Sequence, residues 1–504
     1  MTTTYWQLFG FQKHLEELPR ALVHPAGQQN EDGVDVVLGI RPNGASYLLV
    51  PDIRYYNLRL SRPRVRSSPW PGDCFISLSP IHFPSMAALD EKKKSYDSNK
   101  KDKRGPRDRS KANTTFTSLG DGLSKEGIER ASFEHQRILY HLYRGEIYDP
   151  REFALATLSW MKDARFIAFA FNTWSVDSRD YSERERDPKL LDIGVTEFPP
   201  PSGSHEFVAR SSVHLVNNEN RFLNNPGKRR IPFESGESKI VERLEIATRV
   251  RELLLPSGSS RTPSQVLLFV HDEQRSLALL RALGIDTSQW TSGLMSLLYG
   301  KDFSGKPERD RYDDRRVSDP RSRSPRRNGD PRPRPRSRSP RSQASLRVHI
   351  IDVRQLYCVL KQVAPLVDTV RSNASELGVR DIMGINESDG TFKMANDMNN
   401  GLCAGSESRL LGYMWHSMAC GSPIDDQRML RWHSKLSETV EDHATEESTS
   451  NANARDSDDE EEMDPNDMFQ SVAPTPSGSS APAKKSSLSI LEPGGWEDES
   501  DDDE

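Results

Sequence analysis

Cysteine is scarce in this chain of 504 residues, and its four cysteines are far apart. Cys74, Cys358, Cys403 and Cys420 form no C-x-x-C pair, so we expect neither a zinc site nor a disulfide framework. Long apolar runs are also absent: no segment approaches 18 apolar residues, so no membrane span is predicted. The stretch MTTTYWQLFGFQKHLEEL has no basic segment followed by an apolar core, and no signal peptide is expected. These absences favour a reduced protein of the nucleus and cytoplasm, without membrane contact.

Apolar residues make up only 34% of the chain, charged residues 29%, and the mean hydropathy is −0.73. Such values are typical of folded segments separated by disorder. The net charge of −6 hides two opposite parts. Residues 438–504 contain 21 acidic residues against three basic ones, a net charge of −18, so the rest of the chain carries +12. A basic body with an acidic tail indicates contact with a polyanion, for which the tail competes.

The first third of the chain contains short strands and then helices. Residues 1–88 are predicted to form a small β-rich module, or strands that pack on the main domain. Residues 89–127 are a basic, apolar-poor linker that is expected to be disordered. Residues 128–161 are a helical lead-in. The strand candidates are 34–40, 46–53 and 73–78, and the helix candidates are 128–145 and 149–161.

The main domain is predicted in two parts, 162–303 and 346–437. Three strands in succession are followed by alternating helices and strands, which predicts an α/β fold with a mixed sheet flanked by helices. The predicted strands are 165–172, 190–198, 206–216, 266–271 and 346–352, and the predicted helices are 236–255, 272–285, part of 288–300, 353–367 and 404–420.

The segment 304–345 between these parts is a long Arg/Ser/Pro-rich insertion that is expected to be disordered, because it has too few apolar residues for a core. Residues 306–341 contain 14 basic and 6 acidic residues, a net charge of +8. Its candidate RNA-binding residues are Arg321, Arg323, Arg326, Arg327, Arg332, Arg334, Arg336 and Arg338. Its candidate phosphorylation sites are Ser322, Ser324, Ser337 and Ser339, where four phosphates at roughly −1.5 to −2 each would reverse the sign of the segment.

The acidic tail, residues 438–504, is predicted to be disordered from its composition. Ser457 and Ser500 precede acidic runs, as an acidophilic kinase prefers, and both are phosphorylation candidates. Phe469 and Trp496 are its only aromatic residues. Three roles stay open for the tail: a solubilising segment, a short docking motif, or a salt-sensitive contact with the basic insertion.

Five segments resemble, in the same order, the motifs of one nuclease superfamily. They are FIAFAFNTW with LLDIGVTEF, HLVNNENRFL with FESGESKIV, VLLFVHDEQRSLALLRALGID, IIDVRQLY and LCAGSESRLLGYM. In the same order, the first pair resembles a strand ending in D-x-E with its L-x-E-I-G partner strand, and the second pair resembles the third strand with its F-x-x-G-x-S loop. The last three segments resemble the motifs G-H-x-x-x-x-D-x-x-x-L, I-D-T-x-x-L-Y and H-N-A-G-N-D-A. The chain thus resembles the DEDDh 3′–5′ exonucleases of the ribonuclease H-like superfamily, and more narrowly the fungal "good for full DEAD-box helicase activity" (Gfd-type) C-terminal domain. The resemblance covers 165–300 and 346–420.

The resemblance implies a site in which four carboxylates hold two divalent cations, Mg²⁺ or Mn²⁺, and a histidine is the general base. On this sequence the first two acidic positions are Ala170 and Asn172, the third is Ser276, and the base is Leu402. Glu407 takes the place of the last acid. One carboxylate offsets too little of the charge of two divalent cations. We therefore expect no catalytic residue, no metal and no cofactor, as in a pseudo-exonuclease.

Three interpretations of these positions stay open. The pocket is inert, or it keeps a nucleic-acid groove without chemistry, or another alignment hides an active site. His271 is expected to be structural, and Asp272 to cap the helix that follows it. Five acids lie close to the first strand, most of them expected in a solvated loop although one can reach the site: Asp177, Glu183, Glu185, Asp187 and Asp192.

The leading expectation for function is a non-catalytic RNA-associated adaptor. The family resemblance implies a link to mRNA export, with a DEAD-box helicase or mRNA-export factors as partners, by analogy of fold and family. Two other functions stay open. One is an active metal-dependent 3′–5′ exonuclease, which would need Mg²⁺ or Mn²⁺, and the other is a protein-interaction scaffold without nucleic-acid contact.

Overall fold

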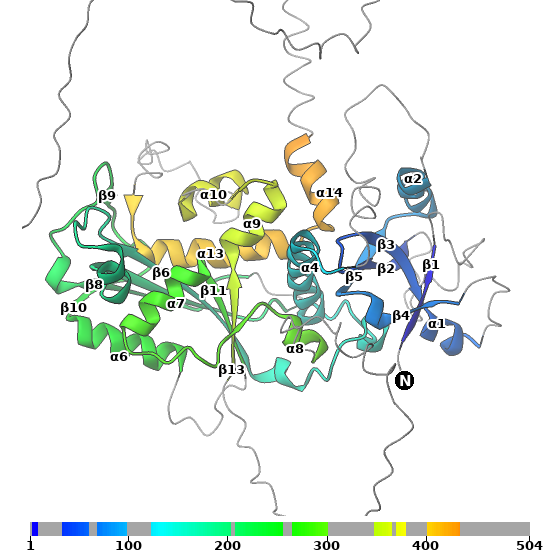
Figure 1. The fold of residues 1–504 in the computed structure, drawn as a ribbon, viewed down its shortest axis with the longest axis horizontal. Helices are drawn as coiled ribbons and strands as arrows, with labels where there is room; N and C mark the ends of the chain where they lie inside the picture. The colour runs from blue at the N-terminus through cyan, green and yellow to red at the C-terminus, as the bar shows by residue number, and fades with distance from the viewer. Residues whose placement is uncertain are drawn as a thin grey trace, which may run out of the picture. The chain divides into compact units, whose positions relative to one another are not determined.

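The computed structural model describes residues 3–8, 33–59, 68–97, 122–202, 207–255, 265–300, 347–364, 369–379 and 401–433. All of them belong to one compact unit within Met1–Glu441 (Figure 1). None of the helices in these ranges is both long enough and apolar enough to span a bilayer. The predicted insertion and tail, with their candidate arginines and serines, lie outside the described residues.

A seven-stranded mixed sheet forms the larger part of the fold, in the order β10-β8-β7-β6-β11-β13-β12. Strands β6, β7 and β8 are antiparallel neighbours, whereas β11 and β13 run parallel to β6. The predicted mixed α/β sheet is therefore confirmed. Its strands are β6 (Ala164–Thr173), β7 (Leu190–Phe198), β8 (Ser211–Asn217), β10 (Ser238–Val241), β11 (Gln265–Val270), β12 (Thr291–Ser292) and β13 (Arg347–Asp352).

Helices cover both faces of this sheet, since its central strand is apolar on both sides. Alternate β6 residues such as Phe166 and Ala168 pack against helix α13, and Ile167 packs with helices α6 and α7 on the opposite face. The helices of this part are α5 (Tyr181–Arg186), α6 (Arg243–Leu254), α7 (Glu273–Ala282), α8 (Met295–Tyr299), α9 (Val353–Lys361), α10 (Val370–Glu376), α13 (Ala404–Ala419) and α14 (Ile424–Arg428). Two short strands, β9 (Arg229–Arg230) and β14 (Gly401–Leu402), pair beside the start of α13.

A second, antiparallel sheet has the order β4-β1-β3-β2-β5. Tyr5 and Leu49 of this sheet, with Phe75 just before β5, share one continuous hydrophobic core with α4 and with the larger sheet. Ser124 caps α4 by accepting a hydrogen bond from the Gly127 amide at 2.9 Å. The elements of this part are β1 (Thr4–Gln7), β2 (Val34–Ile40), β3 (Ser46–Pro51), α1 (Asp52–Asn57), β4 (Trp70–Pro71), β5 (Ser77–Phe83), α2 (Met86–Asp97) and α4 (Lys125–Tyr143).

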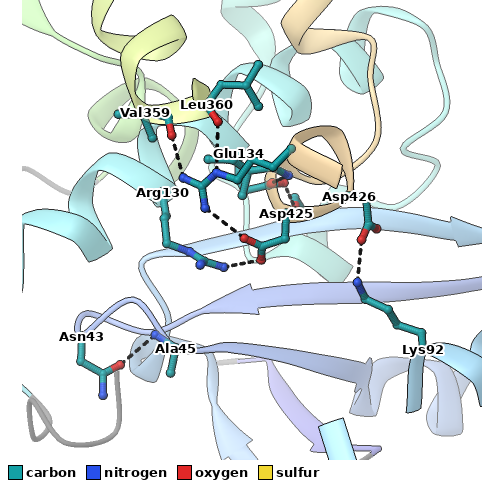
Figure 2. A network of polar contacts seen from close by, with 12 residues as sticks. Asn43, Ala45, Lys92, Arg130, Glu134, Val359, Leu360, Asp425 and Asp426 are labelled. Carbon is teal, nitrogen blue, oxygen red and sulfur yellow. Dashed lines mark hydrogen bonds and ion pairs between the residues drawn. The ribbon is translucent and has the colours of Figure 1, made fainter. Parts of the chain in front are cut away.

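A buried network of ion pairs, shown in Figure 2, joins α4 to the C-terminal helix α14. Asp425 accepts hydrogen bonds from Arg130 at 2.6 Å and from Arg428 at 3.2 Å. Arg428 also donates to the carbonyl oxygens at the end of α9, and Lys92 of α2 pairs with Asp426 at 2.5 Å. Segments from the start, middle and end of the unit are thus held together by opposite charges in direct contact.

Several predictions differ from the structure. The predicted disordered linker 89–127 is wrong at both ends, because helix α2 extends to Asp97 and helix α4 begins at Lys125. The predicted helix 149–161 is wrong: the chain forms two 3₁₀ turns there, because Ala154 adopts a left-handed conformation with φ of 51°. The predicted strand 73–78 is shifted to 77–83, where β5 tolerates Pro80 because it is an edge strand. The predicted helix 236–255 is a short edge strand, β10, followed by α6.

Candidate functional site: a buried polar cluster at the start of helix α13

Two adjacent strands and the first turn of α13 meet at the C-terminal end of β6. Ala170 pairs with Gly194, and Asn172 pairs with Asp192 on β7. A Cβ atom on Gly194 would lie 2.0 Å from the Ala404 carbonyl oxygen, so only glycine permits α13 to begin this close to the strand. The sheet therefore brings Asn172 and Asp192 next to the first residues of α13.

Glu407, in the first turn of α13, is the central carboxylate of this cluster and is only 7% exposed. Asn172 Nδ2 donates a hydrogen bond to Glu407 Oε2 at 3.1 Å. Arg371 from α10 approaches from another side, with its Nε atom 3.7 Å from Glu407 Oε1. That guanidinium is 4% exposed, and its Nε and Nη2 atoms have no hydrogen-bond partner among the residues that the structure describes. Its contact with Glu407 is an ion pair without a hydrogen bond.

A second carboxylate, Asp192, closes the other side of the cluster. Its Oδ2 atom accepts from His214 Nε2 at 2.9 Å and from the Ala404 amide at 3.1 Å. Ser238 is hydrogen-bonded to His214 Nδ1 at 2.7 Å and so orients the imidazole ring. Because its amide contact lies at the start of α13, Asp192 stabilises the positive end of that helix. The Asp192 Oδ1 atom is buried and has no hydrogen-bond partner within the described ranges.

Burial, with a smaller contribution from nearby Asp192, raises the pKa of Glu407 to about 7, although Arg371 and Asn172 act to lower it. The pKa of this carboxyl group is 4.5 in the unfolded chain and about 7 in the folded chain. The protonated form therefore favours folding at low pH. This contribution is full below pH 4.5 and is lost as the pH rises to about 7. Near neutral pH, Glu407 is therefore divided between its neutral and charged forms.

The donor set does not fit the two divalent cations that the family resemblance implies. Glu407 and Asp192 supply at most two negative charges, Asn172 offers an amide, and the guanidinium of Arg371 already faces Glu407. Asp192 Oδ2 is also engaged by two donors. Metal pairs need several carboxylate oxygens at short range. Within the described ranges, no three His, Cys, Asp or Glu side chains are grouped to hold a metal ion.

The other predicted positions are placed differently. Ala170 is 4% exposed and packs in the core on the α13 face. Ser276 is buried in α7, where its amide bonds to Asp272, and no described hydrogen bond joins its side chain to Asn172 or Glu407. Leu402 lies in β14, opposite Arg230. Of the five predicted positions, Asn172 and Glu407 are thus in direct contact.

Of two neighbouring residues, Asp272 takes the capping role expected for it, and the structural role of His271 stays a prediction. Asp272 caps α7 by accepting from the Arg275 amide at 2.9 Å. Burial, followed by the charge of Arg354, lowers the pKa of His271 to about 4, so its imidazole is neutral at physiological pH. His271 lies 3.5 Å from the side-chain amide of Asn373 on α10.

Arg371 and Asp192 are the cluster residues that sequence reasoning did not assign. Asp192 was one of five acids near β6, and its signal is a carboxylate inside the apolar run LLDIGV, because an acid in a buried strand needs a partner. Asp177 is buried as well but pairs with Arg179 at 2.6 Å, away from Glu407 in the hydrogen-bond network. Arg371 carries no such signal, because it follows Val370 in an ordinary helical pattern.

Comparison with known proteins identifies no relative: no family model, curated protein or solved structure matches this chain.

Proposed function

We propose that this chain is a non-catalytic RNA-associated adaptor built on a ribonuclease H-like domain. The strand order β8-β7-β6-β11-β13, with three antiparallel strands followed by two strands parallel to β6, supports this fold. The α helices on both faces are compatible with it.

The observation that carries the non-catalytic part is the contact between Asn172, Glu407 and Arg371. In the enzymes that this chain resembles, the first strand and the last helix each supply a carboxylate to the metals. Here the strand supplies an amide that donates to Glu407, and a buried guanidinium occupies a third side of the carboxylate. These contacts stabilise the polar cluster without a metal, and they leave no set of ligands for two-metal hydrolysis.

The RNA-binding part rests on charge. The insertion carries a net +8 between Lys306 and Arg341. The segment 92–111 contains ten lysines and arginines, of which Lys92 is already paired with Asp426. Cationic side chains that neutralise phosphates release counterions, with a log–log salt slope of about −0.7 for each contact with a single strand. A chain of this kind would act in the nucleus and cytoplasm, together with a DEAD-box helicase or mRNA-export factors, as the family resemblance implies.

The proposal is tested by RNA affinity across a salt series. Three chains are compared: the full chain, a chain lacking 306–342, and a chain that ends at Ser437. The full chain should bind RNA with little sequence preference and a steep salt slope. Removing the insertion should weaken binding and flatten the slope, and removing the acidic tail should strengthen binding. Equal affinity and slope with and without the insertion would overturn the assignment of binding to that segment.

A further inference from the structure

We propose that the loop Asn217–Arg230, together with Trp174, is a stacking platform for the bases of single-stranded RNA. This inference rests on the proposed function and assigns to the folded domain a second part of the RNA contact. The loop follows β8 and reads NNENRFLNNPGKRR, with one acidic residue, Glu219, and four basic ones. Aromatic rings beside cationic side chains are what single-strand binding surfaces use.

An exposed aromatic ring projects from this loop. The Phe222 side chain is 82% exposed, more than any other large apolar residue that the structure describes. The guanidinium carbon of Arg221 lies 4.5 Å from the centre of the ring. No ion pair to Arg221 or to the exposed Arg229 is found in the described part of the chain. The loop therefore presents a π face and positive charge together to solvent.

The loop backbone is held in place by side-chain hydrogen bonds. Asn217 and Asn220 both donate to the Leu190 carbonyl oxygen, at 3.1 and 2.9 Å. Arg230 donates to the carbonyl oxygens of Asn220 and Leu223, each at 3.1 Å, and so fixes the backbone on both sides of Phe222. A loop fixed in this way loses little conformational entropy on binding, so an exposed ring on it is a pre-organised contact.

The same loop is tied to a second aromatic residue at the end of β6. Asn225 donates to the Thr173 carbonyl oxygen at 3.0 Å and accepts from the Ser175 amide at 2.7 Å. Trp174 lies between these two residues, and the ammonium of Lys189 is 4.7 Å from its ring centre. Asn225 therefore links the loop that carries Phe222 and Arg221 to the strand end that carries Trp174, whose ring lies beside Lys189. Single-stranded RNA offers alternating bases and phosphates to such a surface.

The test uses the full chain and an unstructured single-stranded RNA, with affinity measured across a salt series. Phe222→Ala should weaken binding about tenfold with the salt slope unchanged, because stacking involves no counterion release. Phe222→Leu should be as weak, and Phe222→Tyr should bind like the wild type. Arg229→Gln should flatten the slope by about 0.7. Tyr148→Ala, which removes another exposed aromatic side chain (66% exposed), is the matched control and should not affect binding.

The outcomes separate this inference from the proposed function. If the wild type binds RNA with a steep salt slope and Phe222→Ala binds equally well, the platform is wrong and the adaptor proposal stands. If the wild type does not bind RNA, both are wrong. If an acidic peptide with the sequence of residues 456–467 binds more tightly than RNA and depends on Phe222, the loop is a protein-docking surface and the RNA platform is wrong.

Discussion

Two clusters of charged residues in the described part of the chain, around Asp425 and around Glu407, differ in how well their charges are paired. In the cluster around Asp425, two arginines donate hydrogen bonds to one carboxylate. Burial raises the pKa of Asp425, but Arg130, Arg428 and Lys92 lower it more, so the net pKa lies below its usual value. Around Glu407 the guanidinium makes no hydrogen bond to the carboxylate, and burial raises the pKa to about 7.

This difference indicates what each cluster does. The charge-assisted hydrogen bonds around Asp425 connect α4, α9 and α14 directly, so we call this cluster the structural joint. The incompletely paired groups at Glu407 lie at the ends of β6 and β7, where the resemblance implies a former active site. Under the proposed function, these groups are left over from such a site, and their pairing is imperfect because they no longer hold metals. Three predictions test this contrast, and a fourth concerns the insertion.

The largest effect is expected at the structural joint. Arg130→Leu removes a buried cation and leaves Asp425 with a single arginine, so it should destabilise the protein by about 3 to 5 kcal/mol. Chemical denaturation measures the change. Arg151→Leu is the matched control, because its ion pair with Asp149 is exposed to solvent and should contribute little to stability. Similar losses for the two variants would show that the Asp425 cluster is not a joint.

The second prediction concerns the pH dependence of stability. Between pH 4.5 and about 7, the wild type should lose about 3 kcal/mol through Glu407, because the folded carboxyl group must give up its proton while buried. Glu407→Gln should lack this component. The carboxylate of Asp425, with its lowered pKa, has the opposite sign: its contribution is present above pH 3.8 and is lost in acid.

Denaturant unfolding at a series of pH values, with the difference taken between variant and wild type, isolates each group. Glu252→Gln, on the exposed side of α6, is the control for Glu407→Gln and should follow the wild-type profile. A Glu407→Gln profile parallel to that of the wild type would mean that Glu407 is an ordinary ionised carboxylate in the folded protein.

A smaller effect is expected when the cation of the second cluster is removed. Arg371→Leu should cost roughly 1 to 2 kcal/mol, less than Arg130→Leu, because Glu407 can take up a proton and become neutral. The variant should also raise the pKa of Glu407 and move its pH window upward. A loss as large as that of Arg130→Leu would contradict the contrast between the two clusters.

The smallest effect is expected from deletion of 306–342. The described chain stops at Gly300, after α8, and resumes at Arg347, the first residue of β13. Loop closure costs only about 0.6 kcal/mol for each doubling of loop length. Thermal unfolding of the deletion variant should therefore be nearly unchanged. A large fall in Tm would mean that the insertion packs on the folded unit.

Buried, regular elements were predictable from the sequence, and short or exposed ones were not. The predicted strand 190–198 is β7, because its apolar and alternating pattern is that of a buried strand. Strand β10 was missed because Ser238–Val241 is a short edge strand with an exposed pattern. The helix predicted at 149–161 failed since the left-handed backbone of Ala154 has no signature in residue type.

The candidate site was predictable only in part. The contact between Asn172 and Glu407 agrees with their assignment to two positions of one predicted site, because α13 packs directly on β6. Arg371 was not predictable, because it reaches Glu407 through the packing of α10 on α13, and this tertiary contact leaves no periodic pattern in the sequence. Asp192 was recognised only as one of several nearby acids, since its role depends on the pairing of β7 with β6.

The central claim, that the Glu407 cluster performs no metal-dependent chemistry, is tested most directly by a nuclease assay. Purified full-length protein is incubated with 5′-labelled single-stranded RNA and DNA in Mg²⁺ or Mn²⁺, beside a Glu407→Ala variant. The account predicts that both proteins leave the substrates at full length. Metal-dependent shortening from the 3′ end by the wild type, absent from Glu407→Ala, would contradict it and identify the cluster as an active site.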